Sequence, residues 1–204
     1  MIVRPSGHIE STTQEPGWRF CDFDHGLLIE RDRREGARMP TSRFQTVYLL
    51  HGKGGWPGGS VFQLEELLEN VFPDVRYVRP SLPHGREQGQ QAAEVSVAFL
   101  ADLALEPGSL VIGISLGGLV AAALQETSRE DLHVICISSP TLADGVKLER
   151  RMANRLALYS SEDQVIAGRT SGWPALAEAY DLPWLSHDTD AHKVELAQIL
   201  VPRM

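Results

Sequence analysis

Short apolar runs alternate with segments whose apolar residues recur at helical spacing along most of the chain. Runs rich in β-branched and other apolar residues predict buried strands at 46–50, 75–78, 109–114, 132–137 and 155–160, with a further short strand at 182–186. Helical spacing predicts helices at about 60–71, 88–105, 115–128, 173–180 and 193–201. Strands that alternate with helices over short connections indicate an α/β fold, with a mainly parallel central sheet covered by helices on both faces.

Two of the predicted helices have a face that the sequence pattern identifies as buried. In the first, Ser60 is a candidate N-cap, and the apolar positions are Leu64, Leu67, Leu68 and Val71. In the second, the apolar positions are Ala92, Val95, Phe99 and Leu103, and the helix is expected to stop at Pro107-Gly108.

The N-terminal part of the chain has a different pattern. Residues 1–17 are polar with no period, which predicts a flexible tail. Residues 18–23 alternate, a turn follows at 24–26, and residues 27–30 form a candidate return strand. We therefore expect an N-terminal hairpin at the edge of the sheet, and a single domain over residues 18–204.

The composition is that of an ordinary globular protein of 204 residues, with a formal charge of -8. No basic patch is visible to neutralise phosphates, so we expect no nucleic-acid and no membrane partner. The N-terminus lacks the apolar core of a signal peptide, and two distant cysteines, Cys21 and Cys136, do not make a disulfide framework. These features predict a cytoplasmic protein; its oligomeric state is open.

The most informative segment is Gly113-Ile114-Ser115-Leu116-Gly117, at the junction of a predicted strand and a predicted helix. This is the G-x-S-x-G pattern of a nucleophile elbow in its strand–turn–helix context. We expect Ser115 at the apex to adopt positive φ, with Gly113 and Gly117 leaving room for the strand and the helix to approach. The alternative is that Ser115 merely caps a helix.

A second glycine-rich segment follows the strand at 46–50 and begins with His51-Gly52-Lys53-Gly54-Gly55. It does not match a phosphate-binding loop, and the elbow glycines Gly113, Gly117 and Gly118 do not make a dinucleotide fingerprint. For acyl transfer, it is placed to supply one oxyanion donor, the Lys53 N–H, while Leu116 N–H supplies the other. His51 and Gly52 would then shape the loop, and His51 is not proposed as the base.

A serine nucleophile needs a base and an acid that orients it, and in this kind of fold both follow the serine along the chain, acid first. The acid should lie just past the strand at 155–160, and we favour Asp163 over Glu162 and over the earlier Asp144. For the base we favour His192, directly before the last helix, because His187 lies at the end of the strand predicted at 182–186.

The remaining candidates concern the pocket and bound groups. Trp56, Phe62, His84 and Trp173 are candidate pocket residues, although each could equally pack in the core. No histidine–carboxylate cluster has zinc-ligand spacing. We therefore expect no metal and no cofactor.

Together, these motifs resemble the α/β-hydrolase superfamily over nearly the whole chain from about residue 18. The oxyanion loop at His51-Gly52-Lys53, the elbow at 113–117, Asp163 and His192 fall in the family's order. The chain is most similar to small, single-domain serine esterases and thioesterases. It departs at Ile114, where many members have histidine, and in the connection 139–154, which is too short for the cap domain that other members insert there.

The resemblance implies a serine hydrolase that cleaves a small carboxylic ester or thioester through an acyl-enzyme on Ser115. The alternatives are a peptidase or amidase, and a non-catalytic binding or regulatory protein on a hydrolase scaffold. The last alternative would gain support if His192 pointed away from Ser115.

Overall fold

In a computed structural model, residues 18–23, 26–31, 40–85 and 91–204 are described. The chain divides into two compact units, one through Met39 and one from Pro40 to Met204. The first contains the predicted hairpin, in which β1 (Trp18–Phe23) pairs antiparallel with β2 (Gly26–Arg31). The two strands form a sheet of their own. Placement of this hairpin at the edge of the main sheet, in one domain with residues 40–204, stays a prediction, and the tail at 1–17 lies outside the described residues.

The second unit is built on a parallel sheet with strand order β10-β9-β6-β5-β3-β4. The strands are β3 (Thr46–Leu50), β4 (Arg76–Val78), β5 (Leu110–Ile114), β6 (His133–Ile137), β9 (Arg155–Tyr159) and β10 (Glu178–Asp181). Every residue of β3, β5 and β9 is buried, which is expected of parallel strands covered on both faces.

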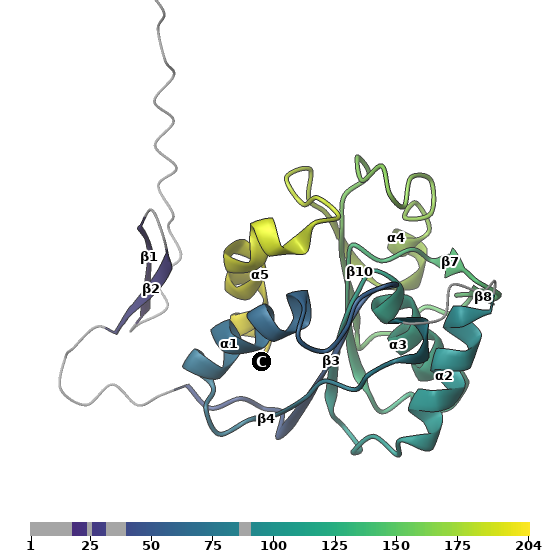
Figure 1. Ribbon diagram of the computed structural model, residues 1–204, viewed down its shortest axis with the longest axis horizontal. Helices are drawn as coiled ribbons and strands as arrows, with labels where there is room; N and C mark the ends of the chain where they lie inside the picture. The colour runs from purple at the N-terminus through teal and green to yellow at the C-terminus, as the bar shows by residue number, and fades with distance from the viewer. Residues whose placement is uncertain (1–17, 24–25, 32–39, 86–90) are drawn as a thin grey trace, which may run out of the picture. The chain divides into compact units, whose positions relative to one another are not determined.

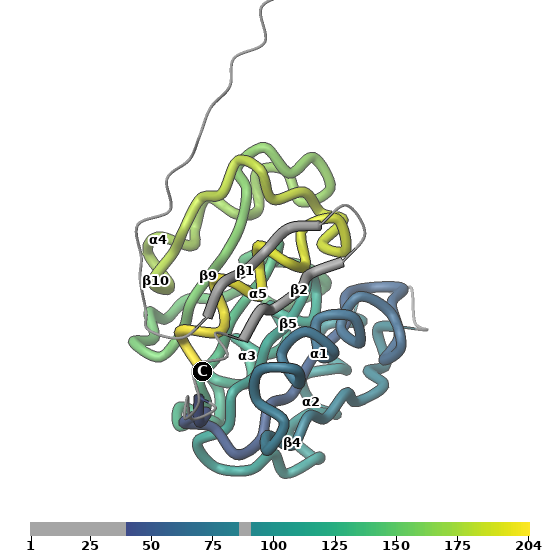
Figure 2. The backbone as a smooth tube through the Cα atoms, turned by 90° about the vertical axis from the view of Figure 1, so that its left-hand side faces the viewer, coloured from purple at the N-terminus to yellow at the C-terminus, as the bar shows by residue number. Residues whose placement is uncertain are grey.

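Helices cover both faces of this sheet (Figures 1 and 2). One layer holds α1 (Ser60–Val71) and α5 (Lys193–Leu200), and the other holds α2 (Ala92–Asp102) and α3 (Leu116–Thr127). Shorter helical turns complete the unit: η1 (Pro83–Gly85), α4 (Trp173–Leu176), η2 (Thr189–His192) and η3 (Val201–Arg203). The structure confirms the predicted fold class, an α/β-hydrolase fold with a mainly parallel sheet. In the part of the chain that is described, no helix is both long enough and apolar enough to cross a lipid bilayer.

Three details of the predicted helices are wrong. The helix predicted at 173–180 is only the four-residue α4, and residues 178–180 belong to strand β10. Ser60 is the first residue of α1 and not its cap; the N-cap is Gly59, which has no side chain to accept a hydrogen bond. In α2 the buried residues are Ala92, Ala93, Ser96 and Leu100, whereas Val95 and Leu103 are exposed. The small residues Ala93 and Ser96 allow α2 to pack closely, and a search for large apolar residues does not find such a face.

The last strand lies earlier than predicted. β10 occupies Glu178–Asp181, whereas the predicted strand at 182–186 is an irregular segment. That segment contains Pro183, which lacks the N–H that a strand donates to its ladder. β10 is an edge strand, so its mostly polar sequence carries little of the apolar signal on which the prediction relied.

The connection from β6 to β9 contains a small hairpin, β7 (Leu142–Ala143) and β8 (Val146–Lys147), turned through Asp144 and Gly145 at positive φ. This connection, residues 138–154, is described throughout and holds no cap domain, as the sequence predicted.

Candidate active site

Ser115 lies at the apex of the turn between β5 and α3, with φ 52° and ψ -123°. Its N–H donates to the Ile137 carbonyl at 2.8 Å, which ties the turn to β6. A Cβ atom added at Gly113 would collide with the backbone of Gly117 and Gly118, and one added at Gly117 would lie 2.5 Å from the carbonyl oxygens of Leu50 and His51. The positive φ and the close approach of strand and helix are those expected of a nucleophile elbow.

His187 is the imidazole that contacts Ser115. Its Nε2 lies 3.1 Å from the Ser115 Oγ, across 72 residues of chain. His187 belongs to the irregular segment after β10, six residues beyond the strand's last residue, Asp181. The ring therefore reaches over the carboxyl ends of the strands, where active sites of open parallel sheets are built.

Asp163 completes the chain of hydrogen bonds. Its Oδ2 accepts from the His187 Nδ1 at 2.9 Å, and its Oδ1 accepts from the Val165 N–H at 2.9 Å. The side chain is 1% exposed. Because the carboxylate accepts from Nδ1, the proton of the neutral ring resides there, which leaves Nε2 free to accept the Ser115 hydroxyl proton.

The prediction that His192 pairs with Ser115 is wrong. His192 ends η2 and is the N-cap of α5, and its ring packs against Trp184 with 5.4 Å between ring centroids. The error follows from the misplaced strand. With the last strand predicted at 182–186, His187 was expected directly at its end, too close to the sheet to reach Ser115. The strand actually ends at Asp181, so the loop between Asp181 and His187 is long enough for the imidazole to reach Ser115.

The other candidate acids lie elsewhere. Glu162 is exposed and accepts no hydrogen bond from His187, whose carboxylate partner is Asp163. Asp144, in the β7–β8 turn, accepts from the Lys53 Nζ at 2.7 Å. Asp163 is thus the acid that the fold brings to the imidazole.

The loop after β3 is held by two buried histidines. His51 accepts from the Leu82 N–H at 3.0 Å through Nε2, so its Nδ1 carries the proton and donates to the Gly52 carbonyl at 2.9 Å. His84 donates through Nε2 to the His51 carbonyl at 2.8 Å, and its Nδ1 contacts the Ser96 hydroxyl at 2.9 Å. Burial lowers the pKa of His51, and it lowers the pKa of His84 to about 4, so both rings are neutral near pH 7.

This loop passes directly beside the nucleophile. A Cβ atom added at Gly52 would lie 3.0 Å from the Ser115 Cβ and 3.6 Å from its Oγ. Lys53 follows, and its N–H has no hydrogen-bond partner among the described residues. Leu116 is the first residue of α3, so its N–H has no partner within the helix either. Both N–H groups therefore belong to residues next to the point where Gly52 approaches Ser115.

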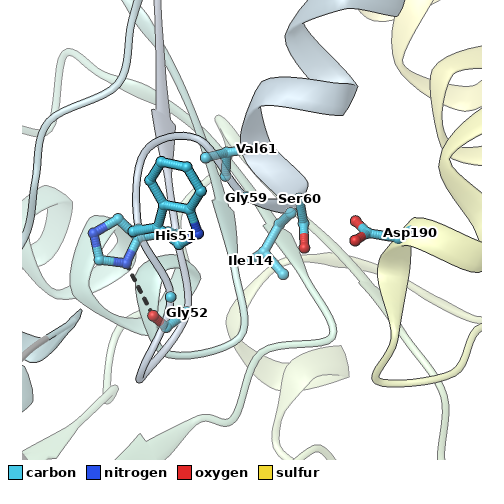
Figure 3. Close-up of a pocket in the computed structure, with 9 residues that line it drawn as sticks. His51, Gly52, Gly59, Ser60, Val61, Ile114 and Asp190 are labelled. Atoms are coloured by element: carbon cyan, nitrogen blue, oxygen red, sulfur yellow. Dashed lines mark hydrogen bonds between the residues drawn. The ribbon is translucent and has the colours of Figure 1, made fainter.

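A cavity of about 240 Å³ adjoins the elbow (Figure 3). The lining residues come from the loop after β3, the start of α1, the end of β5 and η2: His51, Gly52, Gly55, Trp56, Gly59, Ser60, Val61, Ile114 and Asp190. Trp56 is thus at the pocket, as considered from the sequence. The prediction that His84 lines it is wrong, because its ring is fully buried beneath the loop.

The two other aromatic candidates do not line this cavity. Trp173 is fully buried and donates through Nε1 to the Ser139 carbonyl at 2.7 Å, and Phe62 packs under the Arg79 guanidinium. Sequence reasoning missed Ser60, Val61, Ile114 and Asp190 as pocket residues. Ile114 could have been found, because it directly precedes the nucleophile; Asp190 could not, because only the fold brings η2 to α1.

Comparison with known proteins agrees with this architecture. Residues 47–203 match the model of the alpha/beta hydrolase family. No curated protein sequence matches the chain.

Several solved structures share the fold. A serine hydrolase involved in carbazole degradation is 13% identical with a TM-score of 0.61, over 78% of this chain and 90% of that one. Alpha/beta hydrolase domain-containing protein 10 from mouse is 10% identical with a TM-score of 0.60, over 92% and 98%. A protein described as a hydrolase of the α/β superfamily, from Xanthomonas campestris pv. campestris, is 19% identical with a TM-score of 0.57, over 78% and 99%.

At these identities the structures establish only the shared fold. The match of the family model spans most of the chain, from β3 to the last helical turn, and includes Ser115, Asp163 and His187. On that basis, the chain belongs to the α/β-hydrolase family.

Proposed function

We propose that this hydrolase cleaves small carboxylic esters or thioesters through an acyl-enzyme formed on Ser115. The observation that carries the proposal is the continuous hydrogen-bonded chain from Ser115 Oγ to His187 Nε2 and from His187 Nδ1 to Asp163 Oδ2, at 3.1 and 2.9 Å. A serine hydroxyl is a weak nucleophile unless a base within hydrogen-bond distance takes its proton, and a carboxylate that orients the base stabilises the imidazolium that forms.

In the acylation step, the Ser115 Oγ attacks the carbonyl carbon while His187 Nε2 takes the hydroxyl proton. The carbonyl π electrons move to oxygen, and the N–H groups of Lys53 and Leu116 are the donors we assign to that oxyanion. The tetrahedral intermediate collapses as His187 gives its proton to the leaving alkoxide or thiolate. Water, deprotonated by His187, then attacks the acyl-enzyme, and Ser115 leaves with the proton restored.

The short β6–β9 connection supports a small or exposed substrate. The hairpin of β7 and β8 contains four strand residues and places no domain over the site. A cavity of about 240 Å³ has room for a short acyl chain and not for a long lipid chain.

The misassigned His192 bears on the non-catalytic alternative. That alternative was expected to gain support if His192 pointed away from Ser115. His192 does lie against Trp184, but another imidazole, that of His187, occupies the position beside Ser115. The three triad groups are therefore still in contact, which favours an enzyme.

Turnover of matched substrates tests the proposal. We expect hydrolysis of p-nitrophenyl acetate and S-phenyl thioacetate, with far slower cleavage of p-nitroacetanilide, and loss of activity in Ser115→Ala. Ser161→Ala is the control, because Ser161 is an exposed serine two residues before Asp163. Faster cleavage of the anilide than of the ester would favour an amidase, and ester turnover that survives Ser115→Ala would overturn the proposal.

A further inference from the structure

The cavity beside the elbow is lined by residues that adjoin the nucleophile and by a carboxylate. Ile114 directly precedes Ser115, and a Cβ atom added at Gly52 would lie 3.0 Å from the Ser115 Cβ, so these two lining residues place one wall of the cavity beside the reacting serine. At another wall lies Asp190, on η2. In Figure 3 the Asp190 carboxylate projects from η2 toward Ser60 at the start of α1.

Asp190 is held in place by an amide and by the carboxylate of Asp188, neither of which carries a positive charge. Its Oδ2 accepts from the Gln63 amide at 3.3 Å, and its N–H donates to the Asp188 Oδ1 at 3.2 Å. The nearest cation on this network is Lys193, whose Nζ donates to the Oε1 of the same Gln63 amide at 2.7 Å. Gln63 therefore stands between the two charges, and no ion pair joins Asp190 to a cation among the described residues.

The other charges around the site do not neutralise Asp190. Lys53, on the adjoining loop, is paired with Asp144. Burial lowers the pKa of His51, so that ring is neutral near pH 7. Among the described residues that line the cavity, Asp190 alone carries a formal charge.

An aromatic wall accompanies this carboxylate. Trp56 lines the same cavity and is 65% exposed, which is unusual for so large an apolar side chain. An indole face attracts cations through its quadrupole, and a carboxylate on the same cavity adds Coulomb attraction. Ile114 and Val61 supply an apolar surface for the carbon chain that would join such a cation to the ester.

We propose that the cavity selects substrates whose acyl chain ends in a cationic amine, recognised by Asp190 and Trp56. The inference rests on the proposed function for its catalytic consequence. The acyl carbonyl would lie beside Ser115 and the amine beside Asp190. The preference for a substrate would therefore depend on both the charge and the length of its acyl chain.

A pair of isosteric esters tests the inference. The cationic probe is the p-nitrophenyl ester of 4-(trimethylammonio)butanoic acid, and its neutral counterpart is the p-nitrophenyl ester of 5,5-dimethylhexanoic acid. We expect the wild type to hydrolyse the cationic ester with a kcat/KM about 5- to 10-fold higher. Asp190→Asn should abolish this preference, while hydrolysis of the neutral ester changes less than about twofold.

A matched control separates a local effect from the general negative charge of the protein. Glu195→Gln removes an exposed carboxylate from the first turn of α5, three residues after η2 ends. It should retain the preference for the cationic ester. Equal rates for the two esters in the wild type, or the same loss of preference in both variants, would overturn the inference.

Equilibrium binding separates this inference from the proposed function. Titration calorimetry on Ser115→Ala, with the primary amides of the same two acids, measures recognition without turnover. Tighter binding of the cationic amide that is lost when Asp190→Asn is added supports the inference even if the wild type hydrolyses neither ester. Equal binding of the two amides overturns it, whatever the activity.

Discussion

At the scale of single residues, the site depends on the strained backbone of Ser115 and on which nitrogen of His187 carries the proton. Ser115 is a non-glycine residue at φ 52°, a conformation that costs of the order of 1–3 kcal/mol and persists only where the surroundings impose it. Its neighbours do so through the hydrogen bond to Ile137 and through the glycines that flank it. The strain points the hydroxyl at His187, whose proton on Nδ1 is fixed by Asp163.

Replacing Asp163 and replacing Asp144, the two aspartates considered as the triad acid, should have very different effects on activity. Asp163→Asn should lower kcat for ester hydrolysis by on the order of 10⁴-fold, because an amide can donate to His187 Nδ1 and so favours the wrong tautomer. Asp144→Asn removes only the partly exposed ion pair to Lys53 and should change kcat by less than about threefold. Steady-state rates of the two variants check this, and a larger loss in Asp144→Asn would contradict the assignment.

At the scale of elements, the elbow helix and the loop after β3 are fitted against each other. Gly117 lies in the first turn of α3, where the Leu50 and His51 carbonyls leave no space for a side chain. The same His51 carbonyl accepts from His84, so the contact links α3, β3 and η1. The position of the N–H groups that we propose as oxyanion donors therefore depends on a residue that has no functional group.

Gly117→Ala should destabilise the protein by about 1–3 kcal/mol, although alanine is the better helix former by about 1 kcal/mol. The added Cβ would lie 2.5 Å from two backbone oxygens, which cannot rotate away. We also expect kcat to fall, because the displaced loop carries Lys53.

Chemical denaturation measures the stability of this variant, with Gly172→Ala as control. A Cβ atom at Gly172 would meet only the Thr141 side chain, at 3.2 Å or more. Equal stabilities of the two variants would show that the close approach at Gly117 is not energetically important.

The elements also show what could be predicted from the sequence. Buried parallel strands such as β3 and β5 are continuous apolar runs, so their positions were predicted within a residue. The edge strand β10 has the sequence Glu-Ala-Tyr-Asp, which contains no apolar run, and most of it was predicted as the end of a helix at 173–180. Because this one strand was misplaced, His192 was predicted as the base in place of His187. The predictions of Ser115 and Asp163 were unaffected, because both residues follow strands with a clear apolar run.

At the scale of the whole molecule, the parallel sheet collects residues from distant parts of the chain at its carboxyl edge. Ser115 follows β5, Asp163 follows β9, His187 follows β10, and the loop with Lys53 follows β3. The pocket adds η2, brought to α1 by packing of α5, and this proximity has no local sequence signal. On the other side of the sheet, packing of η1 against α2 and the loop after β3 buries His84 without a charged partner, so the stability of the whole fold depends on pH.

The titration of His84 should contribute to the pH dependence of the free energy of unfolding. Its pKa is about 4 in the folded protein, lowered chiefly by burial from 6.5, so between these values the unfolded chain binds a proton that the folded protein does not. The free energy of unfolding should therefore fall as pH drops below 6.5, by about 2–3 kcal/mol at pH 4.5 from this residue.

His84→Gln isolates that contribution, because glutamine can still donate to the His51 carbonyl but does not titrate. Urea denaturation at pH 7 and pH 4.5 should show a smaller loss of stability in the variant than in the wild type. An identical loss in both proteins would mean that His84 does not set the acid sensitivity.

The central claim is that the fold activates Ser115 through His187, and labelling with a fluorophosphonate probe tests it most directly. We expect rapid labelling of the wild type and of His192→Ala, no labelling of Ser115→Ala, and a labelling rate at least about 10²-fold lower in His187→Ala. Rapid labelling of His187→Ala together with slow labelling of His192→Ala would contradict the account, as would the absence of labelling in folded wild-type protein.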